Sequence, residues 1–392
     1  MRIAVVGGGI GGLAAAIALS RIGVDVHLYE QAPELTEVGA GITLAPNALD
    51  ALDVLGLAGE IRTHSIAGLQ AGVRKPSGGF VISMSADDLA GQIGTVAVMH
   101  RAELLAVLAS AIEPARLHLG CACAGFESGP SGITLKLNTG ETIQADGLIA
   151  ADGLRSTVRA QMFGNADVRY AGYTAWRAVV DFPERRDLVL GETWGPGRRF
   201  GIVPMSDGRV YWFATKNAPP EQRDPPGRTK ETLANLFRGW HSPVEALIAA
   251  AREDSILRND IYDLAPLTQF AQGRVALLGD AAHAMTPNLG QGACQAIEDA
   301  VVLAVCLKKA GHMEPALLEY ERRRLPRTRQ ILIRSRQFGG IAQIQNPALC
   351  WLRDSALRLA PHSTTTREAQ ALLGVEVLTP AEKALFASPG ES

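Results

Sequence analysis

Three glycines near the N-terminus have the spacing of a phosphate-binding turn. Gly7, Gly9 and Gly12 lie in the segment GGGIGG, between the apolar run RIAVVG and the small-residue run LAAAIALSRIG. In such a turn the first glycine permits the sharp bend, the second lets the backbone approach a pyrophosphate, and the third lets a helix pack against a strand. The amides at the start of that helix would face the phosphates. The spacing therefore predicts a dinucleotide site in a strand–turn–helix unit.

Glu30 ends the next strand-like run, VDVHLYE. A carboxylate there can accept hydrogen bonds from both hydroxyls of an adenosine ribose, and it would repel a 2′-phosphate. The motif alone does not choose between NAD and FAD. Residues 37–56 contain no ordinary third strand, and Arg101 stands at the start of the helix expected in MHRAELLAVL. This long insertion favours a ligand larger than a nicotinamide nucleotide.

A second segment able to do chemistry begins at residue 279 and reads GDAAHAMTPNLGQGACQAIEDA. The apolar run RVALL before it predicts a strand, so Asp280 would lie at the carboxyl edge of a sheet, where cofactors bind in doubly wound folds. A loop rich in proline and glycine follows, and then a helix. His283 is more typical of a hydrogen-bonded scaffold residue than of an acid or base. The acidic pair Glu298 and Asp299 is expected to anchor its helix.

Three separated segments together resemble the single-component (group A) flavoprotein monooxygenases, the aromatic hydroxylase group that includes salicylate and 4-hydroxybenzoate hydroxylases. They are GGGIGG with Glu30, DGLIAADGLRSTVR at 146–159, and the stretch from GRVALL at 273 to IEDA. The stretch from ILRNDIYDLAP to IEDA, with YAGYTAW, is similar to zeaxanthin epoxidases. The arrangement of Arg199, Pro204 and Tyr211 is similar to FAD-dependent urate hydroxylases. The two similarities point to different substrates.

The resemblance implies that FAD is the bound cofactor, with its adenosine at the first motif and its flavin at the second. Asp280 would contact ribityl or ribose hydroxyls, and the backbone of residues 288–292 would pass under the isoalloxazine ring. The following helix would direct its N-terminal amides, equivalent to about half a positive charge, at the flavin. The implied FAD-binding residues are Gly7, Gly9, Gly12, Glu30, Arg101, Asp152, Asp280, Pro287, Gly290, Gln291 and Gly292.

The resemblance also implies a reaction. In this family NAD(P)H reduces FAD, oxygen adds at the flavin C4a, and the distal oxygen of the hydroperoxide passes to an electron-rich aromatic or heteroaromatic substrate. The chain has no second G-x-G-x-x-G for NAD(P)H and no metal-ligand constellation. An epoxidase that acts on an apolar alkene is one alternative. A flavoprotein used for sensing or electron transfer, without oxygen insertion, is another.

Residues 167–216 change character and predict an antiparallel sheet. The runs YTAWRAVVDF, DLVLGETWG, RRFGIVPM and RVYWFATK are separated by Pro, Gly and charge pairs. Such a sheet can cover the reactive face of a flavin. Arg199 and Tyr211 are the polar candidates for the catalytic site; an edge-strand salt bridge and a packed tyrosine are the alternatives. Trp176, Phe200 and Phe213 could supply apolar walls, although strand alternation lets only some of these side chains face the site.

Two further segments carry arginines. Arg155 and Arg159, with Ser156, follow Asp152 on a helix that the resemblance associates with FAD phosphates and pyridine nucleotide use; pairing on the helix surface is the alternative. From residue 319, EYERRRLPRTRQILIRSRQ predicts a basic helix that is interrupted by Pro326. Its basic residues could simply form a solvent-exposed helix face, or they could attract a nicotinamide dinucleotide.

Composition limits the partners. The chain has 392 residues, 47% of them hydrophobic, with a formal net charge of −2, which gives no electrostatic reason to expect nucleic acid or an anionic membrane surface. Its five cysteines do not make a disulfide framework. No stretch predicts a membrane span. We expect a cytoplasmic monomer or homodimer whose partners are a small aromatic substrate and O2.

The fold class expected from these patterns is α/β. It combines a Rossmann-like FAD-binding domain, an inserted antiparallel β-sheet domain for the substrate, and a C-terminal helical segment. The expected boundaries are 1–70, 97–165 and 268–345 for the FAD-binding domain, 71–96 and 166–267 for the substrate-binding domain, and 346–392 for the C-terminal helices and tail.

Overall fold

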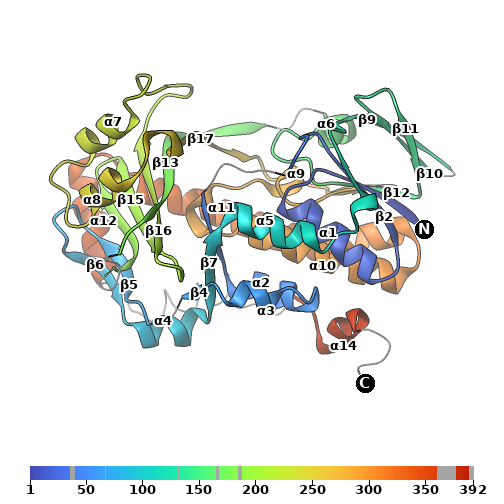
Figure 1. Cartoon of the computed structure of the whole chain (residues 1–392), viewed down its shortest axis with the longest axis horizontal. Helices are drawn as coiled ribbons and strands as arrows, with labels where there is room; N and C mark the ends of the chain where they lie inside the picture. The colour runs from blue at the N-terminus through green and yellow to red at the C-terminus, as the bar shows by residue number, and fades with distance from the viewer. Residues whose placement is uncertain are drawn as a thin grey trace.

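A six-stranded sheet forms one end of the molecule in the computed structural model (Figure 1). The structure describes residues 1–35, 40–66, 68–130, 132–164, 167–183, 188–359 and 377–387. The strand order is β18-β19-β12-β1-β2-β8, and every neighbouring pair is parallel except β18 and β19. The bounds are β1 Arg2–Val6, β2 Asp25–Glu30, β8 Leu117–Leu119, β12 Gly147–Ala150, β18 Ala271–Gln272 and β19 Val275–Leu277.

Helices and a small sheet cover this parallel sheet, because its central strands are apolar on both faces. Helix α1 (Ile10–Arg21) packs against both the sheet and α10 (Gly292–Ala310). The three-stranded sheet β11-β10-β9 joins the same core through Ile133 and Leu135. The bounds of the other covering elements are α5 Arg101–Ser110, η1 Pro114–Arg116, β9 Cys123–Gly129, β10 Gly132–Leu137, β11 Thr142–Ala145, α6 Thr157–Phe163 and α9 Asp280–His283.

The long insertion after Glu30 adds no strand to the parallel sheet. Instead β3 joins a separate antiparallel sheet of order β3-β7-β4, and α2 follows it against α10. Residues 36–39 of this insertion lie outside the described residues. The bounds are β3 Gly41–Leu44, α2 Pro46–Val54, α3 Ala58–Arg62, β4 Ser65–Ile66 and β7 Val96–His100.

A seven-stranded sheet forms the other end, in the order β17-β13-β16-β15-β14-β5-β6. All its pairs are antiparallel except β14 with β5. The predicted combination of a Rossmann-like sheet with an antiparallel one is therefore confirmed. The assignment of the second sheet to the substrate, with its domain boundaries, stays a prediction. The bounds are β5 Ala71–Arg74, β6 Phe80–Met84, α4 Ala86–Ile93, β13 Val168–Asp181, β14 Leu190–Gly195, β15 Arg198–Pro204, β16 Arg209–Asn217, α7 Thr229–Leu236, α8 Val244–Ala250, η3 Glu253–Ser255 and β17 Leu257–Leu264.

Strand alternation sorts the aromatic residues of this sheet onto two faces. Trp176 and Phe200 lie in a core with residues of α7 and α8. Tyr211 points to the opposite face, with Val98 and Val203 of a separate cluster that faces the parallel-sheet end. The expectation that Trp176 and Phe200 could wall a ligand site is therefore wrong, because alternate residues of a strand point to opposite faces.

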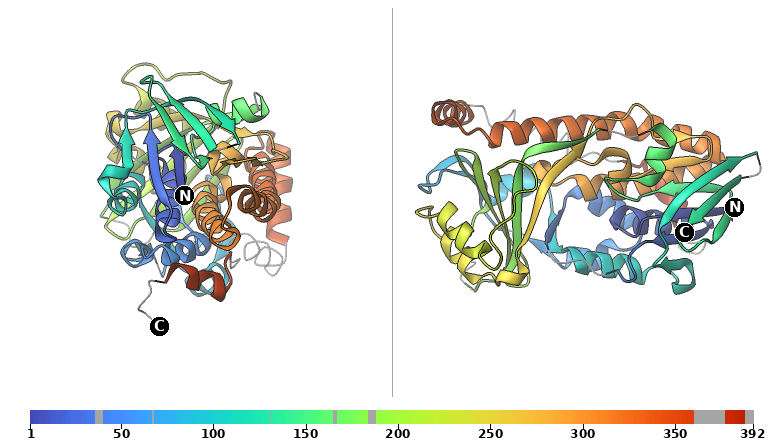
Figure 2. Two further views of the ribbon diagram at one scale, coloured as in Figure 1. Left: turned by 90° about the vertical axis from the view of Figure 1, so that its right-hand side faces the viewer. Right: turned by 90° about the horizontal axis from the view of Figure 1, so that it is seen from above.

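Helix α11 (Met313–Ala342) runs along one side of the molecule, from the parallel-sheet end towards the seven-stranded sheet (Figure 2). It continues through Pro326, so the predicted interruption is wrong. Pro326 is exposed, and the carbonyl of Arg322 that loses its helical partner is on the solvent side, where water can hydrogen bond to it. A buried stripe that includes Tyr320, Thr328 and Leu332 holds the helix on both sides of the proline.

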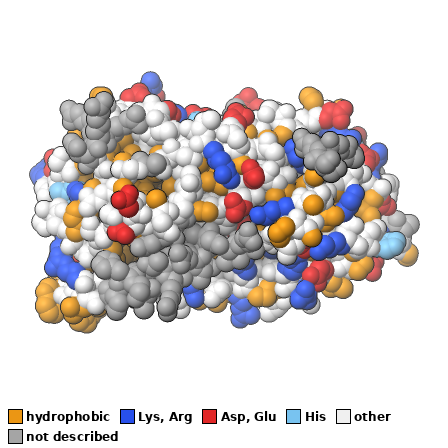
Figure 3. Space-filling model, turned by 90° about the horizontal axis from the view of Figure 1, so that it is seen from below, with side chains coloured by type: hydrophobic (Ala, Val, Ile, Leu, Met, Phe, Trp, Pro, Cys, Tyr) orange, Lys and Arg blue, Asp and Glu red, His pale blue; other side chains and the backbone are white. Residues whose placement is uncertain are grey.

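The C-terminal elements are α12 (Pro347–Leu359), α14 (Pro380–Lys383) and η5 (Ala384–Phe386). Residues 360–376 and 388–392 of the predicted tail lie outside the described residues. Among the helices that the structure describes, none is long and apolar enough to cross a bilayer. On the face seen from below, acidic and basic side chains are interspersed (Figure 3).

Candidate cofactor and active site

The glycine-rich turn between β1 and α1 is packed on one side and open on the other. Gly7 has a φ of +102°, and a Cβ at Gly12 would overlap the carbonyl oxygen of Gly7. By contrast, a Cβ at Gly9 would meet nothing within 4 Å. Gly9 is the N-cap of α1 and provides no side-chain cap, so amides of the first turn keep no intrahelical partner. This surface can accept a phosphate.

Glu30 lies against the same turn. One carboxylate oxygen accepts a hydrogen bond from the amide of Gly8, and the other accepts one from the amide of Ala32 at 2.8 Å. Each carboxylate oxygen has a second lone pair, so both can still accept hydrogen bonds from a sugar hydroxyl. The structure thus brings Glu30 next to the predicted phosphate-binding backbone.

Asp152 lies directly behind the turn, because a Cβ at Gly7 would come within 2.9 Å of the Asp152 amide nitrogen. Its Oδ2 accepts hydrogen bonds from the amides of Thr157 and Val158, at 2.9 and 3.3 Å. Its Oδ1 is buried and has no hydrogen-bond partner among the described residues. A buried acceptor of this kind needs a donor, and a bound ligand can provide one.

Arg155, Ser156 and Arg159, which follow Asp152 in the segment at 146–159, differ in their surroundings. Arg155 is exposed. Ser156 is the buried N-cap of α6 and accepts a hydrogen bond from the Arg159 amide at 2.9 Å. The Arg159 guanidinium is buried and donates to the carbonyl oxygens of Ala281 and Leu154, at 2.8 and 2.6 Å. Arg159 therefore connects the segment at 146–159 to the turn that carries Asp280, rather than pairing on a helix surface.

Asp299 of α10 holds the turn that carries Asp280. Its Oδ2 accepts hydrogen bonds from the amide of Gly279 at 3.0 Å and from His283 Nε2 at 2.6 Å, while its Oδ1 accepts one from Arg324 Nε at 2.6 Å. Burial by itself raises the pKa of the Asp299 carboxyl, but His283 and Arg324 outweigh it and hold that pKa below its ordinary value. Asp280 itself is exposed at the start of α9.

Glu298, one of the acidic pair expected to anchor α10, is the centre of a buried cluster whose other members sequence reasoning missed. It pairs with Arg324 and Arg327, and it accepts a hydrogen bond from Asn47 of α2. Burial opposes ionisation of Glu298, but the two arginines keep its pKa lowered. Arg324 falls four residues after buried Tyr320 and four before buried Thr328, so helical periodicity is the signal that could have placed it inside.

The predicted flavin loop is fixed from two sides. In η4 (Pro287–Leu289), Asn288 Oδ1 accepts hydrogen bonds from Arg199 at 2.8 Å and Tyr173 at 3.1 Å. Asn288 Nδ2 donates to the carbonyl oxygen of Ser335 in α11 at 2.9 Å. The sheet and the long helix therefore set the position of this loop together.

The loop surface beyond Asn288 is open. Gly290 has a φ of +63°, and a Cβ at Gly290 or Gly292 would meet nothing within 4 Å. Gln291 is buried, and its side-chain nitrogen Nε2 has no hydrogen-bond partner within the described chain. It is also the N-cap residue of α10, but its side chain accepts no hydrogen bond from the first turn of that helix. The backbone at Gly290 and Gly292 is open, and the first amides of α10 and the Gln291 Nε2 group can donate hydrogen bonds. A flat ring that carries carbonyl acceptors fits such a surface.

The two catalytic candidates occupy different positions. Arg199 is 1% exposed, and its three nitrogens donate to Gln343, Glu192 and Asn288. Tyr211 packs its ring directly over Gly41 of β3, where no Cβ would fit. Burial raises the pKa of Tyr211, against the opposing charge of Arg177, so its hydroxyl stays protonated at neutral pH.

Strand β3 joins these parts into one site. Cys294 Sγ lies 3.8 Å from the Thr43 carbonyl oxygen and 3.5 Å from that of Gly290, so β3 adjoins the loop. The amide of Arg101 donates to Ala40 at 3.0 Å, which places the predicted Arg101 at the start of β3. A Cβ at Gly11 would lie 2.8 Å from Leu278 Cδ2, so the N-terminal turn and the Asp280 turn are also neighbours. The residues present thus fit one extended dinucleotide that ends in a flat ring.

Comparison with known proteins agrees with this geometry. The family model described as "FAD binding domain" matches residues 1–335. The chain belongs to this family. The resemblance seen in the sequence is confirmed: the protein is an FAD-dependent monooxygenase, and FAD is its cofactor.

Relatives of this monooxygenase differ in the substrates for which they are named. It is 41% identical to the aurachin C monooxygenase/isomerase of Stigmatella aurantiaca, over 92% of this chain and 94% of that protein. It is 37% identical to the zeaxanthin epoxidase of Solanum lycopersicum, over 79% of this chain and 48% of that protein. The crystal structure of Klebsiella pneumoniae HpxO with FAD and uric acid superposes with a TM-score of 0.88 at 31% identity, covering 95% of this chain and 96% of that one.

We expect Asp280→Ala to weaken FAD binding to the monooxygenase by about 10- to 150-fold, the loss for one hydrogen bond to a charged group. The carboxylate is exposed and accepts no hydrogen bond from the described residues, so the fold should persist. Fluorescence titration of FAD into the apoprotein measures the effect. Asp254→Ala, at an exposed site in η3, is the matched control. Equal FAD affinity in both variants would remove Asp280 from the site.

Proposed function

We propose that the enzyme inserts one oxygen atom of O2, at the expense of NAD(P)H, into an aromatic or heteroaromatic small molecule. The substrate ring would lie between the loop at residues 287–292 and the face of the seven-stranded sheet that carries Tyr211 and Phe213. The observation that supports this placement is that β3 adjoins both walls: Gly41 packs under Tyr211, and Thr43 neighbours the Gly290 side of the loop.

The proposed binding face combines apolar walls with one hydroxyl donor. The rings of Tyr211 and Phe213 lie 6.2 Å apart, and Phe213 covers Gly201 of the adjacent strand. Such rings can stack against a flat substrate and exclude water from it. The protonated Tyr211 hydroxyl can donate a hydrogen bond to a phenolate, enolate or urate-like oxygen and so orient the ring.

FAD, when bound, supplies the redox chemistry, taking electrons from NAD(P)H and passing them to O2. The chain's own contribution is positional and electrostatic. The positive end of α10 lies at Gly292, where it stabilises negative charge on a bound ring. Arg199 donates to Asn288 from within the protein, so we assign it a positioning role for the loop rather than direct contact with the substrate.

A substrate screen tests the function. Phenols, purines and quinolones are offered to the FAD-loaded enzyme, and both NAD(P)H consumption and transfer of oxygen from 18O2 into product are measured. The proposal expects at least one ring class to stimulate consumption and to gain one labelled oxygen. Stimulation by apolar alkenes alone, with epoxide as the product, would replace hydroxylation by the epoxidase alternative.

Once a substrate with an anionic ring oxygen is identified, Tyr211→Phe is expected to lower kcat/KM by about 10- to 150-fold, the range for one hydrogen bond to a charged group. FAD content should be unchanged, and a larger share of NAD(P)H should be oxidised without product, because the ring is less well oriented. Tyr262→Phe, on β17 at the far edge of the sheet, is the matched control. If the two variants behave alike, Tyr211 does not contact the substrate.

A further inference from the structure

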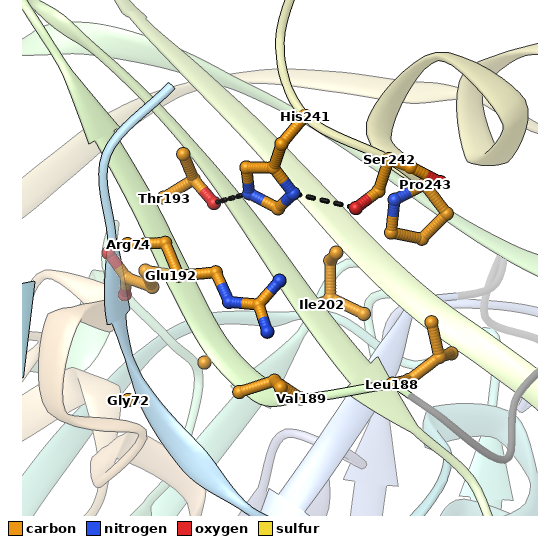
Figure 4. Close-up of a pocket in the computed structure, with 11 residues that line it drawn as sticks. Gly72, Arg74, Leu188, Val189, Glu192, Thr193, Ile202, His241, Ser242 and Pro243 are labelled. Carbon is orange, nitrogen blue, oxygen red and sulfur yellow. Dashed lines mark hydrogen bonds between the residues drawn. The ribbon is translucent and has the colours of Figure 1, made fainter. Parts of the chain in front are cut away.

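A small cavity lies on the face of the seven-stranded sheet that points away from Tyr211 (Figure 4). Thr193 of β14 and Ile202 of β15 face it, whereas Val203, the chain neighbour of Ile202, faces the parallel-sheet end. Its volume is about 40 Å³. A cavity needs roughly 10–15 Å³ of such volume to hold one water, so this one has room for a ligand group of only a few atoms.

Arg74 of β5 supplies the only positive charge among the described residues that line the cavity. Its guanidinium points between Ile202 and Val189 in Figure 4 and lies over the ring of Phe80, with Cζ 4.5 Å from the centroid. Its Nε is buried and has no hydrogen-bond partner in the described chain. Burial lowers the pKa of Arg74.

Among the described residues, the acids near Arg74 have other partners. Glu192 lines part of the cavity, but its carboxylate accepts hydrogen bonds from Trp194 at 2.7 Å and Arg199 at 3.2 Å. Asp354 pairs with Lys75 and Arg353. A guanidinium is always charged, and a half-buried one without an anion costs free energy that a bound anion would recover. The Arg74 guanidinium, which has no anionic partner among the described residues, is therefore a group that a bound anion would stabilise.

The rest of the lining selects the kind of anion. His241 Nε2 lies 2.8 Å from Thr193 Oγ1, and its Nδ1 lies 2.7 Å from the Ser242 carbonyl oxygen. Since that carbonyl can only accept, Nδ1 carries a proton. Burial, with the charge of Arg74, lowers the pKa of His241, which leaves the ring neutral at pH 7. Among the described lining residues Arg74 is thus the one cation, enough for a monoanion but not for a dianion.

We propose that this cavity binds a small monocarboxylate. Its two oxygens would accept parallel hydrogen bonds from the Arg74 guanidinium, the geometry that matches a carboxylate to arginine. Its short apolar part would lie against the Leu188, Ile202 and Pro243 side chains of the lining. This site is separate from the proposed substrate site, which faces the opposite side of the sheet.

Propionate is a suitable probe, with propionamide as its uncharged counterpart and inorganic phosphate as the competing anion. Binding to the FAD-loaded enzyme is followed at constant ionic strength by calorimetry, and by the NMR signal of the Arg74 Nε–H. We expect saturable binding of one propionate, a shift of that signal, and no binding of propionamide. Tighter binding of phosphate than of propionate would overturn the choice of a carboxylate, and no saturable binding of propionate would overturn the site.

Arg74→Met and Arg74→Gln are each expected to weaken propionate binding by about 10- to 150-fold, as for loss of a charged hydrogen-bond partner. Arg238→Met removes the same charge from an exposed position at the end of α7 and should leave binding unchanged. Unweakened binding in the Arg74 variants would overturn the proposal. If neither variant folds, the Arg74 Nε–H signal of the wild-type enzyme decides, because a signal that propionate does not move excludes the site.

Discussion

Asp299→Ala is expected to lower the free energy of unfolding by about 3–5 kcal/mol, the loss when one partner of a buried ion pair is removed. The substitution takes the acceptor from Arg324, from His283 and from the amide of Gly279, and Asp299 and Arg324 are at most 1% exposed. A buried guanidinium without its anion is the costliest of these losses. Since domains are stable by only about 5–15 kcal/mol, much of the stability would disappear.

Urea unfolding of the apoprotein measures this loss without the added stability that bound FAD confers. Asp254→Ala is the control, because its ion pair with Arg252 is exposed and screened by solvent, so its loss should leave the urea midpoint nearly unchanged. The Asp280→Ala variant provides a second comparison, since it should lose FAD affinity without loss of stability in the apoprotein. An Asp299→Ala midpoint equal to that of Asp254→Ala would show that the cluster does not stabilise the fold.

The parts of the site that the sequence predicted are local in the chain. The turn at Gly7 to Gly12, the strand that ends at Glu30 and the strand–loop–helix from Gly279 are each specified by spacing within about 25 residues. Their backbone requirements, such as a positive φ at Gly7 and Gly279, follow directly from the presence of glycine. The apolar strands between them determine the parallel sheet that brings these turns together.

The supporting network could not be read in the same way, because its partners are far apart in the chain. Asn47 and Glu298 are 251 residues apart, and Arg199 and Asn288 are 89 apart. A polar residue gives no sign of its partner, and the run ERRRLPRTR contains several arginines of which only one points fully inward. Helical register could single out Arg324 as buried, but only the fold identifies the carboxylates that it meets.

The same limit applies to Arg199. The sequence placed it on a strand near the flavin and left open a substrate contact or a salt bridge. The structure gives it the salt bridge to Glu192 together with the bond to the loop residue Asn288. Alternation along a strand tells which face of the sheet a side chain points to. It does not tell whether that side chain is covered by other protein residues or is open to a substrate, so it cannot separate the two roles of Arg199.

Gly12→Ala and Gly9→Ala form the pair that tests the N-terminal turn most directly. A Cβ at Gly12 would overlap the Gly7 carbonyl oxygen, and both belong to backbone that the sheet and α1 hold in place. Overpacking of this kind costs about 1–3 kcal/mol or more, so we expect Gly12→Ala to destabilise the apoprotein and to abolish FAD retention. The purified protein should be colourless.

Gly9→Ala separates cofactor binding from folding. Gly9 has a φ of −72°, which alanine adopts without strain, and its Cβ would meet no protein atom within 4 Å. The apoprotein should therefore unfold at the wild-type urea midpoint, whereas FAD affinity should fall, because the methyl group would occupy the space that the pyrophosphate requires. If Gly9→Ala bound FAD as tightly as the wild type, the open side of the turn would not be the phosphate site. If both variants unfolded early, the loss of FAD would report on folding alone.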